Sequence, residues 1–145
     1  MIRQVIDCET RNDPEGLGYF NAPRGDRKHT GHDFAVRPGA EILSPVDGTV
    51  GRIGYAYGDD LSYRIVDIRT SDGYRHRLFY VAPAVEWGDP VNTGMVIGIA
   101  QDVSRYYNSS VMIPHVHYEI LNRNSKNIDP IDYRPTKTVG PSQKN

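Results

Sequence analysis

The sequence has one cysteine, no long apolar run and almost no net charge. Cys8 has no second cysteine to pair with, which excludes an intrachain disulfide, and we expect a small buried apolar residue there because no neighbouring motif suggests an activated thiol. No apolar run approaches the roughly 20 residues that cross a bilayer, so we expect no membrane span. Lysine and arginine number 17 against 18 aspartate and glutamate, and the formal net charge of -1 argues against a nucleic-acid or anionic-membrane partner.

Helical signals are also scarce. No segment combines a helical hydrophobic period with caps at both ends, whereas 14 glycines and 10 prolines punctuate the chain. Short runs that favour strands lie between these turn signals, at residues 49–55, 63–69, 74–81, 95–100 and 116–121. The length of 145 residues suits one domain. We predict an all-β fold with little helix, mainly antiparallel and either sandwich-like or a partly open barrel.

Two stretches of the chain read as irregular. Asp72-Gly73 offers a tight hairpin turn between two predicted strands. Residues 102–113 form the most polar internal stretch, and we expect a loop there that overhangs the strand after it. Beyond Arg134 the chain is polar and contains glycine and proline, which predicts a flexible tail over residues 134–145.

Two short histidine motifs are the most informative feature of the chain. The first reads His-Thr-Gly-His-Asp at 29–33, and the second reads Pro-His-Val-His-Tyr-Glu at 114–119. Side chains two or four residues apart share a face of a strand, so His115 and His117 share one face, as do His29 and Asp33 if that segment is extended. If the two segments meet, three nitrogen and oxygen ligands with one position open for water describe a hydrolytic zinc site. The alternative is a metal-free β domain with surface histidines.

Further motifs follow the first one in a definite order. They are Pro38-Gly39, Pro-Val-Asp-Gly-Thr-Val at 45–50, Gly-Asp-Pro-Val at 88–91, Gly-Met-Val-Ile-Gly at 94–98 and Asp129-Pro130. Together with both histidine motifs, this ordered set resembles the lysostaphin-like, or LytM-type, zinc peptidases, which are peptidoglycan endopeptidases. The resemblance covers residues 16–133, so we expect an N-terminal extension at 1–15, the peptidase domain at 16–133 and the tail at 134–145.

The resemblance implies a site and an activity. It implies an antiparallel β fold with a groove, zinc (Zn2+) held by His29, Asp33 and His117, and His115 as a catalytic group. It also implies hydrolysis of the peptide cross-links of bacterial peptidoglycan by a metal-activated water, at the bacterial cell wall. Residues 1–7 lack the apolar stretch of a secretory signal, so we expect either a phage-encoded protein or part of a larger exported one. No feature predicts the oligomeric state.

One departure from the family pattern bears on catalysis. The family carries a second catalytic histidine on the strand before the Gly-Asp turn, where this chain has Leu-Phe-Tyr-Val at 78–81. Tyr80 takes that position if the alignment to the family pattern is shifted by one residue. Its phenol can donate a hydrogen bond to a developing oxyanion. His76 is an alternative if the strand is shifted, and Tyr80 is then a core or groove aromatic. The departure also allows a zinc-binding but catalytically silent module that binds the wall or docks a protein.

His32 is the remaining histidine of the first motif. The family usually has an apolar residue at this position, and we expect a structural role for His32 rather than metal ligation. A ligand pair of His29 and His32 would need a helical turn, which Gly31 does not favour.

Overall fold

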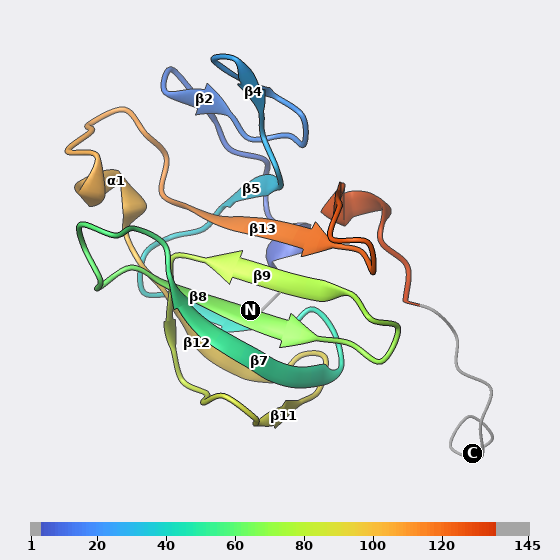
Figure 1. Ribbon diagram of the computed structural model, residues 1–145. Helices are drawn as coiled ribbons and strands as arrows, with labels where there is room; N and C mark the ends of the chain where they lie inside the picture. The colour runs from blue at the N-terminus through green and yellow to red at the C-terminus, as the bar shows by residue number, and fades with distance from the viewer. Residues whose placement is uncertain (1–3, 136–145) are drawn as a thin grey trace.

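The computed structural model describes residues 4–135, and its framework is two antiparallel β-sheets (Figure 1). The larger sheet has seven strands, of which β13 (His115–Leu121) has neighbours on both sides. One neighbour is β9 (Arg75–Phe79). On the other side, β5 (His32–Ala35) pairs with the first residues of β13 and β14 (Asn127–Ile128) with the last. Segments that are far apart in the sequence therefore meet along β13.

The remaining strands complete both sheets. From β9, the large sheet continues through β8 (Arg64–Arg69) and β7 (Gly48–Tyr55) to β11 (Pro90–Val91). The small sheet has the order β10 (Val81–Pro83), β12 (Val96–Ala100), β6 (Glu41–Leu43). Two short hairpins stand outside the sheets: β1 (Asn12–Asp13) with β2 (Gly16–Leu17), and β3 (Pro23–Arg24) with β4 (Arg27–Lys28). The helical segments are α1 (Val103–Tyr106) and two short 3-10 turns, Val5–Asp7 and Pro130–Asp132.

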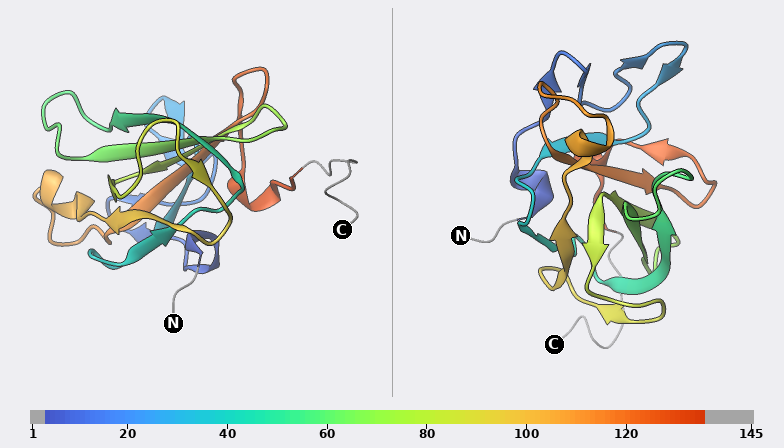
Figure 2. Two further views of the ribbon diagram at one scale, coloured as in Figure 1. Left: turned by 90° about the horizontal axis from the view of Figure 1, so that it is seen from below. Right: turned by 90° about the vertical axis from the view of Figure 1, so that its left-hand side faces the viewer.

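The hydrophobic core draws on both sheets, which lie against each other in the views of Figure 2. The large sheet contributes Val66, Leu78 and Ile120, all fully buried. Ile42 of β6 and Ile97 of β12 meet them from the small sheet. Each such aliphatic side chain stabilises the fold by roughly 1.5–3 kcal/mol through its removal from water.

Strand β13 is buried on both of its faces. Side chains alternate along a strand, and the core-facing ones are Val116, Tyr118 and Ile120. The opposite face carries His115, His117 and Glu119, and these are buried as well. The hairpins β1–β2 and β3–β4 stand beyond β5 on the same side of the molecule (Figure 1). The fold thus encloses a polar cluster on the second face of β13.

The predicted all-β class is confirmed, and the sheets form no closed barrel over residues 4–135. The predicted loop at 102–113 needs a correction, because Val103–Tyr106 forms one helical turn. Asp102 caps that turn, since its carboxylate accepts a hydrogen bond from the backbone N–H of Ser104. The sequence signal for this helical turn was only a capping aspartate, because the segment after it is too short to show a helical period.

The predicted strand at 74–81 also needs a correction, because Tyr80 interrupts it. Its φ of 71° lies in the left-handed region, so β9 ends at Phe79 and the chain passes into β10 of the small sheet. The extended geometry expected for 29–33 is wrong in part. β5 begins at His32, and His29 precedes it in an irregular segment.

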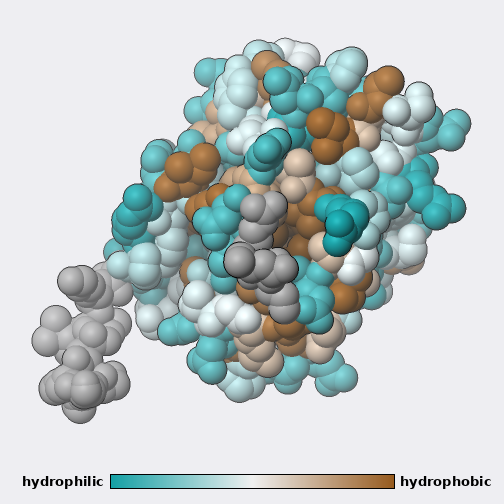
Figure 3. Space-filling model, turned by 180° about the vertical axis from the view of Figure 1, so that it is seen from behind, coloured by the Kyte–Doolittle hydropathy of each residue, from teal (hydrophilic) through white to brown (hydrophobic). Residues whose placement is uncertain are grey.

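The segment that we expected to be an N-terminal extension packs against the domain. Val5 is part of the core, and Thr10 forms an isolated bridge with Phe34. The expected C-terminal tail lies outside the described residues from position 136 onward. Within residues 4–135, no helix has the length and hydropathy of a bilayer-crossing segment. On the face seen from behind, apolar and hydrophilic residues are interspersed (Figure 3).

Candidate metal centre

Three side chains from two distant segments of the chain point their donor atoms at one another. His29 Nε2 lies 3.0 Å from His117 Nδ1 and 3.2 Å from Asp33 Oδ1, and His117 Nδ1 lies 2.9 Å from Asp33 Oδ1. All three residues are buried. They form a compact triangle of two imidazole nitrogens and one carboxylate oxygen.

The pairing of β5 with β13 creates this triangle. Asp33 and His117 are direct partners across the two strands, so their side chains emerge on the same face. His29 reaches the same point from the segment that follows β4, where its backbone N–H donates to the carbonyl of Ala22. Gly31 makes this approach possible. A Cβ at position 31 would lie 2.4 Å from the carbonyl oxygen of Tyr118 and 2.9 Å from His117 Cε1.

The triangle fits a tetrahedral metal. Metal–ligand bonds of about 2.0–2.2 Å place neighbouring tetrahedral ligands about 3.4 Å apart, a few tenths of an ångström wider than the separations here. Each imidazole is also oriented through its other nitrogen. His29 Nδ1 lies 3.0 Å from the carbonyl oxygen of Tyr19, and His117 Nε2 lies 3.1 Å from Glu119 Oε1. Acceptors at these outer nitrogens favour the tautomers that leave the inner nitrogens bare for a cation.

Glu119 is the centre of a second hydrogen-bond network behind His117. Besides His117, its carboxylate accepts from Thr30 Oγ1 at 2.8 Å and from Arg77 Nη1 at 2.6 Å. Burial raises the pKa of Glu119, but the hydrogen bond and charge of His117 and the other donors outweigh this and lower it to about 2. Burial likewise lowers the pKa of His117, yet its hydrogen bonds to Asp33 and Glu119 raise it to about 9.

Arg11 supports Asp33 from the N-terminal segment. Arg11 Nη1 donates to Asp33 Oδ2 at 3.1 Å, so the other carboxylate oxygen remains directed at the histidines. Burial opposes ionisation of Asp33, but hydrogen bonds from His117 and His29 hold its pKa well below its ordinary value. Sequence reasoning missed Arg11 because it lies before the first motif and within the expected extension. No local pattern marks an arginine that reaches across to another segment.

His115 lies beside the triangle rather than within it. Its Nδ1 donates to the carbonyl oxygen of Ile113 at 2.7 Å, which turns Nε2 toward the site, 3.6 Å from Asp33 Oδ2. Burial lowers the pKa of His115, although the charge of Asp33 acts in the other direction. A neutral imidazole with an unprotonated Nε2 facing the site is suited to accept a proton.

Tyr80 reaches the same groove as His115. Their rings meet edge to face, with centroids 5.6 Å apart and planes at 84°. Burial raises the pKa of Tyr80 well above its usual range, so the phenol stays protonated at physiological pH. The structure therefore brings together five of the six predicted site residues, the exception being His76.

The structure does not place His76 where the alternative to Tyr80 would need it. It pairs with Ile120 on β13, and its ring faces the core side of the sheet, where Nδ1 lies 2.7 Å from Tyr118 Oη. Its ring also packs against Tyr133, at 4.6 Å between centroids. Because Tyr118 and His117 point to opposite faces of β13, His76 is separated from the triangle by the sheet. The strand shift that would have brought it into the site does not occur.

His32 also lies away from the triangle. It stacks on Phe34 at 4.3 Å between ring centroids, and its Nε2 lies 2.8 Å from Thr10 Oγ1. These contacts tie the N-terminal segment to β5.

The triangle opens into a groove of about 290 Å³. His115, Tyr80 and Tyr107 line one part of it. Four cationic side chains contribute to its walls: Arg11, Arg24, Arg27 and Lys28. Of these, Arg27 and Lys28 are exposed on β4, and they give the groove an electropositive rim beside the candidate ligands.

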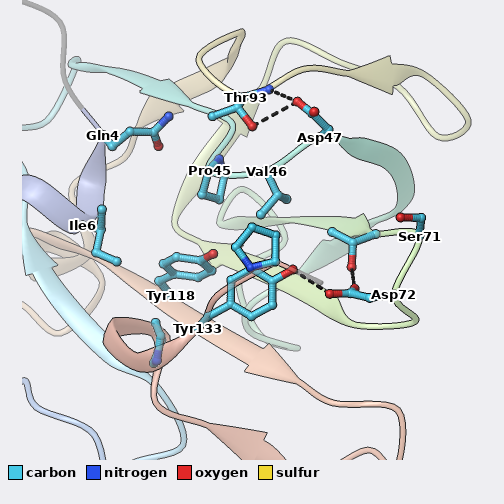
Figure 4. Close-up of a pocket in the computed structure, with 13 residues that line it drawn as sticks. Gln4, Ile6, Pro45, Val46, Asp47, Ser71, Asp72, Thr93, Tyr118 and Tyr133 are labelled. Carbon is cyan, nitrogen blue, oxygen red and sulfur yellow. Dashed lines mark hydrogen bonds between the residues drawn. The ribbon is translucent and has the colours of Figure 1, made fainter. Parts of the chain in front are cut away.

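A larger cavity of about 460 Å³ lies on the other face of β13 (Figure 4). Tyr118 and Tyr133 point into it, and the hydroxyl of Tyr133 donates to Asp72 Oδ2 at 2.8 Å. It contains none of the three candidate ligands. The candidate site is therefore identified by the convergence of His29, Asp33 and His117 and not by the volume of its cavity.

Comparison with known proteins places the chain in a peptidase family. Peptidase family M23 matches residues 27–130. An uncharacterized metalloprotease of Haemophilus influenzae is 26% identical over 106 residues, which cover 72% of this chain and 21% of that protein. The chain thus spans about a fifth of the length of that relative.

Two solved structures share the fold. The catalytic domain of the antimicrobial peptidase lysostaphin from Staphylococcus simulans is 24% identical, with a TM-score of 0.62 and coverage of 83% of this chain and 90% of that one. A zinc-containing peptidase from Vibrio cholerae is 21% identical, with a TM-score of 0.64 and coverage of 92% of this chain and 40% of that one. The family match begins at residue 27 and so includes the triangle, His115 and Tyr80, whereas Arg11 precedes it.

Proposed function

The chain belongs to peptidase family M23, and on this premise we propose that it is a zinc-dependent endopeptidase that hydrolyses the peptide cross-links of bacterial peptidoglycan. The observation that carries the proposal is the triangle of His29, Asp33 and His117 beside a free imidazole nitrogen of His115. A ligand set with a neighbouring base is the minimal equipment of a hydrolytic metal site. The name of the Haemophilus relative, a metalloprotease, agrees with it.

The metal ligands in this proposal are His29 Nε2, Asp33 Oδ1 and His117 Nδ1. A zinc ion held by these atoms would supply Lewis-acid chemistry for the activation of water and of the scissile carbonyl. Other groups of the chain hold these atoms in place: Arg11 fixes the carboxylate, while the carbonyl of Tyr19 and the carboxylate of Glu119 orient the two rings. Such preorganisation reduces the cost of assembling the site.

His115 acts as the general base and then as the general acid. Its Nδ1 proton is held by the carbonyl of Ile113, so Nε2 accepts the proton of the attacking water. The same nitrogen then delivers the proton to the leaving amine. Asp33 Oδ2, 3.6 Å from Nε2, stabilises the imidazolium that exists between the two transfers.

Tyr80 acts as a neutral hydrogen-bond donor to the oxygen of the scissile carbonyl as negative charge develops on it. The groove position beside His115 and the raised pKa of the phenol support this role. Donation does not require Tyr80 to lose its proton, so the role is compatible with its high pKa. Tyr80 does what the expected second histidine would do as a donor, without serving as a proton shuttle.

The proposed substrate is an extended peptide at the bacterial cell wall, outside the cytoplasm. The electropositive rim formed by Arg27 and Lys28 favours peptides that carry carboxylates. Delivery by a phage or as part of a larger exported protein remains our prediction for how such a domain reaches the wall.

A second candidate function follows from the replacement at position 80. A zinc-binding module that docks on the wall without cutting it needs the same triangle but no catalytic donor. Incubation of purified peptidoglycan with the protein separates the two functions, with mass analysis of the released fragments. Cleavage that stops with a chelator and returns with zinc supports the enzyme, whereas zinc-loaded protein that sediments with intact wall supports the module.

A further inference from the structure

Five tyrosines gather at the edge of the groove, from three separate segments. This tyrosine cluster comprises Tyr57, Tyr63, Tyr80, Tyr106 and Tyr107. Tyr57 lies in the loop between β7 and β8, and its ring stacks on Tyr106 at 3.7 Å between centroids with planes only 4° apart. The cluster therefore fixes the loop after β7 against the segment around α1. None of these contacts was foreseen from the sequence, because most of them join residues of different segments.

Three phenol oxygens of the cluster form a chain that ends in the groove. The hydroxyl of Tyr57 lies 3.2 Å from that of Tyr80 and 2.9 Å from that of Tyr107. Tyr80 is at the inner end, beside His115, and the half-exposed Tyr107 is at the outer end. Tyr57 is the link between them.

The backbone of Tyr80 is held in an unfavourable conformation. A φ of 71° is strained for an aromatic residue, and such strain persists only where the surroundings fix it. Here the N–H of Tyr80 donates to the carbonyl of Arg64 at 2.8 Å, and its carbonyl accepts from the N–H of Gln101 at 2.9 Å. Both backbone groups are therefore anchored, and the Tyr57 hydroxyl anchors the other end of the side chain.

The direction of the hydrogen bonds decides what Tyr80 can do. Each phenol has a single proton to donate. If Tyr80 donates to Tyr57, it has no proton left for a group in the groove. If Tyr107 donates to Tyr57 and Tyr57 donates to Tyr80, the proton of Tyr80 is free to point into the groove, and the chain polarises it.

We propose that Tyr57 is a positioning residue, which donates to the Tyr80 oxygen and thereby directs the Tyr80 hydroxyl at the reacting carbonyl. This inference rests on the proposed function, since it concerns the donor to the same carbonyl. Tyr57 touches no substrate and acts through Tyr80 alone. The geometry that supports it is the 3.2 Å separation of the Tyr57 and Tyr80 hydroxyl oxygens, with Tyr57 as the donor.

The test compares Tyr57→Phe with Tyr80→Phe and with the double variant, in cleavage of a defined cross-linked wall peptide. Tyr57→Phe keeps the ring that stacks on Tyr106 and removes only the hydroxyl. We expect kcat to fall about tenfold in Tyr57→Phe with KM changed less than about twofold, and the double variant to be no worse than Tyr80→Phe alone. Tyr63→Phe is the matched control, because it removes a hydroxyl of the cluster that bonds to the carbonyl of Asp102 instead.

A second readout is independent of activity. In the protein labelled with 13C at tyrosine Cζ, Tyr57→Phe should shift the resonance of Tyr80, and Tyr63→Phe should leave it in place. If the wild-type protein leaves the wall peptide intact, the proposed function fails. If the wild type cleaves but Tyr57→Phe keeps its kcat, or if the two substitutions are additive, the function stands and the role of Tyr57 is overturned.

Discussion

His29 Nε2 and His117 Nδ1 face each other at 3.0 Å, although 88 positions separate the two residues in the chain. Two imidazole nitrogens this close share either a proton or a cation, because two bare lone pairs repel. Asp33 Oδ1 adjoins both nitrogens and favours a positive charge between them. The site is therefore built for a positive charge, which a proton on His117 supplies when no metal is bound.

The first prediction concerns the pH dependence of the metal-free protein. The folded pKa of His117, about 9, lies above the unfolded value of 6.5, so its contribution to stability is fully present below pH 6.5 and is lost as pH rises through 9. The shift corresponds to at most about 3 kcal/mol. Thermal unfolding in a chelator should show Tm falling between pH 6.5 and 9. His117→Asn should flatten this dependence, and an unchanged slope would contradict the assignment.

The second prediction concerns Gly31. In Gly31→Ala the new Cβ meets the carbonyl oxygen of Tyr118 and the ring of His117, both below van der Waals distance. We expect a destabilisation of about 2 kcal/mol or more and weaker zinc binding, because β5 and β13 must separate. Gly58→Ala is the control, since nothing lies within 4 Å of its Cβ position. Urea unfolding and zinc titration of both variants provide the measurement. Equal behaviour of the two would show that close approach at Gly31 is unimportant.

The third prediction separates His115 from the metal ligands. His115→Ala removes the proposed base but none of the three triangle atoms. The variant should keep its zinc while kcat for wall peptides falls about 10²- to 10⁴-fold. Metal analysis and kinetics on one preparation make the comparison. Loss of zinc together with activity would instead make His115 a ligand.

The fourth prediction concerns Glu119, which orients His117 from behind. Glu119→Gln keeps the shape of the side chain but removes the charge that faces His117 and Arg77. Zinc affinity should fall about 10- to 100-fold, as is usual for an outer partner of a metal-bound histidine. Glu41→Gln, on the exposed edge of β6, is the control. A competition assay with a coloured chelator measures both, and equal affinities would remove Glu119 from the site.

Much of the fold could be predicted from the sequence because its signals are local. Runs such as 49–55 and the Asp72-Gly73 turn correspond directly to β7 and to the hairpin of β8 with β9. The break at Tyr80 was not predictable, since a left-handed tyrosine is fixed by its partners on Arg64 and Gln101 rather than by its neighbours in sequence.

The candidate site, like the fold, was predictable only in part. The triangle residues lie in compact motifs, and the pairing of β5 with β13 brings Asp33 to His117 as expected, whereas His29 reaches them from an irregular segment. His76 was misplaced because the prediction assumed one uninterrupted strand through Tyr80, whereas the left-handed conformation at Tyr80 ends β9 and breaks the alternation of faces. Arg11 and Tyr57 were missed because their contacts, with Asp33 and Tyr80, join distant segments without any motif.

The most direct test of the account is the zinc content of the purified protein compared with that of His117→Ala. Elemental mass spectrometry after dialysis against zinc and removal of the excess should find one zinc per wild-type chain and less than a tenth of that in the variant. Circular dichroism verifies that the variant is folded. A folded His117→Ala protein with a full equivalent of zinc would contradict the assignment of His29, Asp33 and His117 as the metal centre.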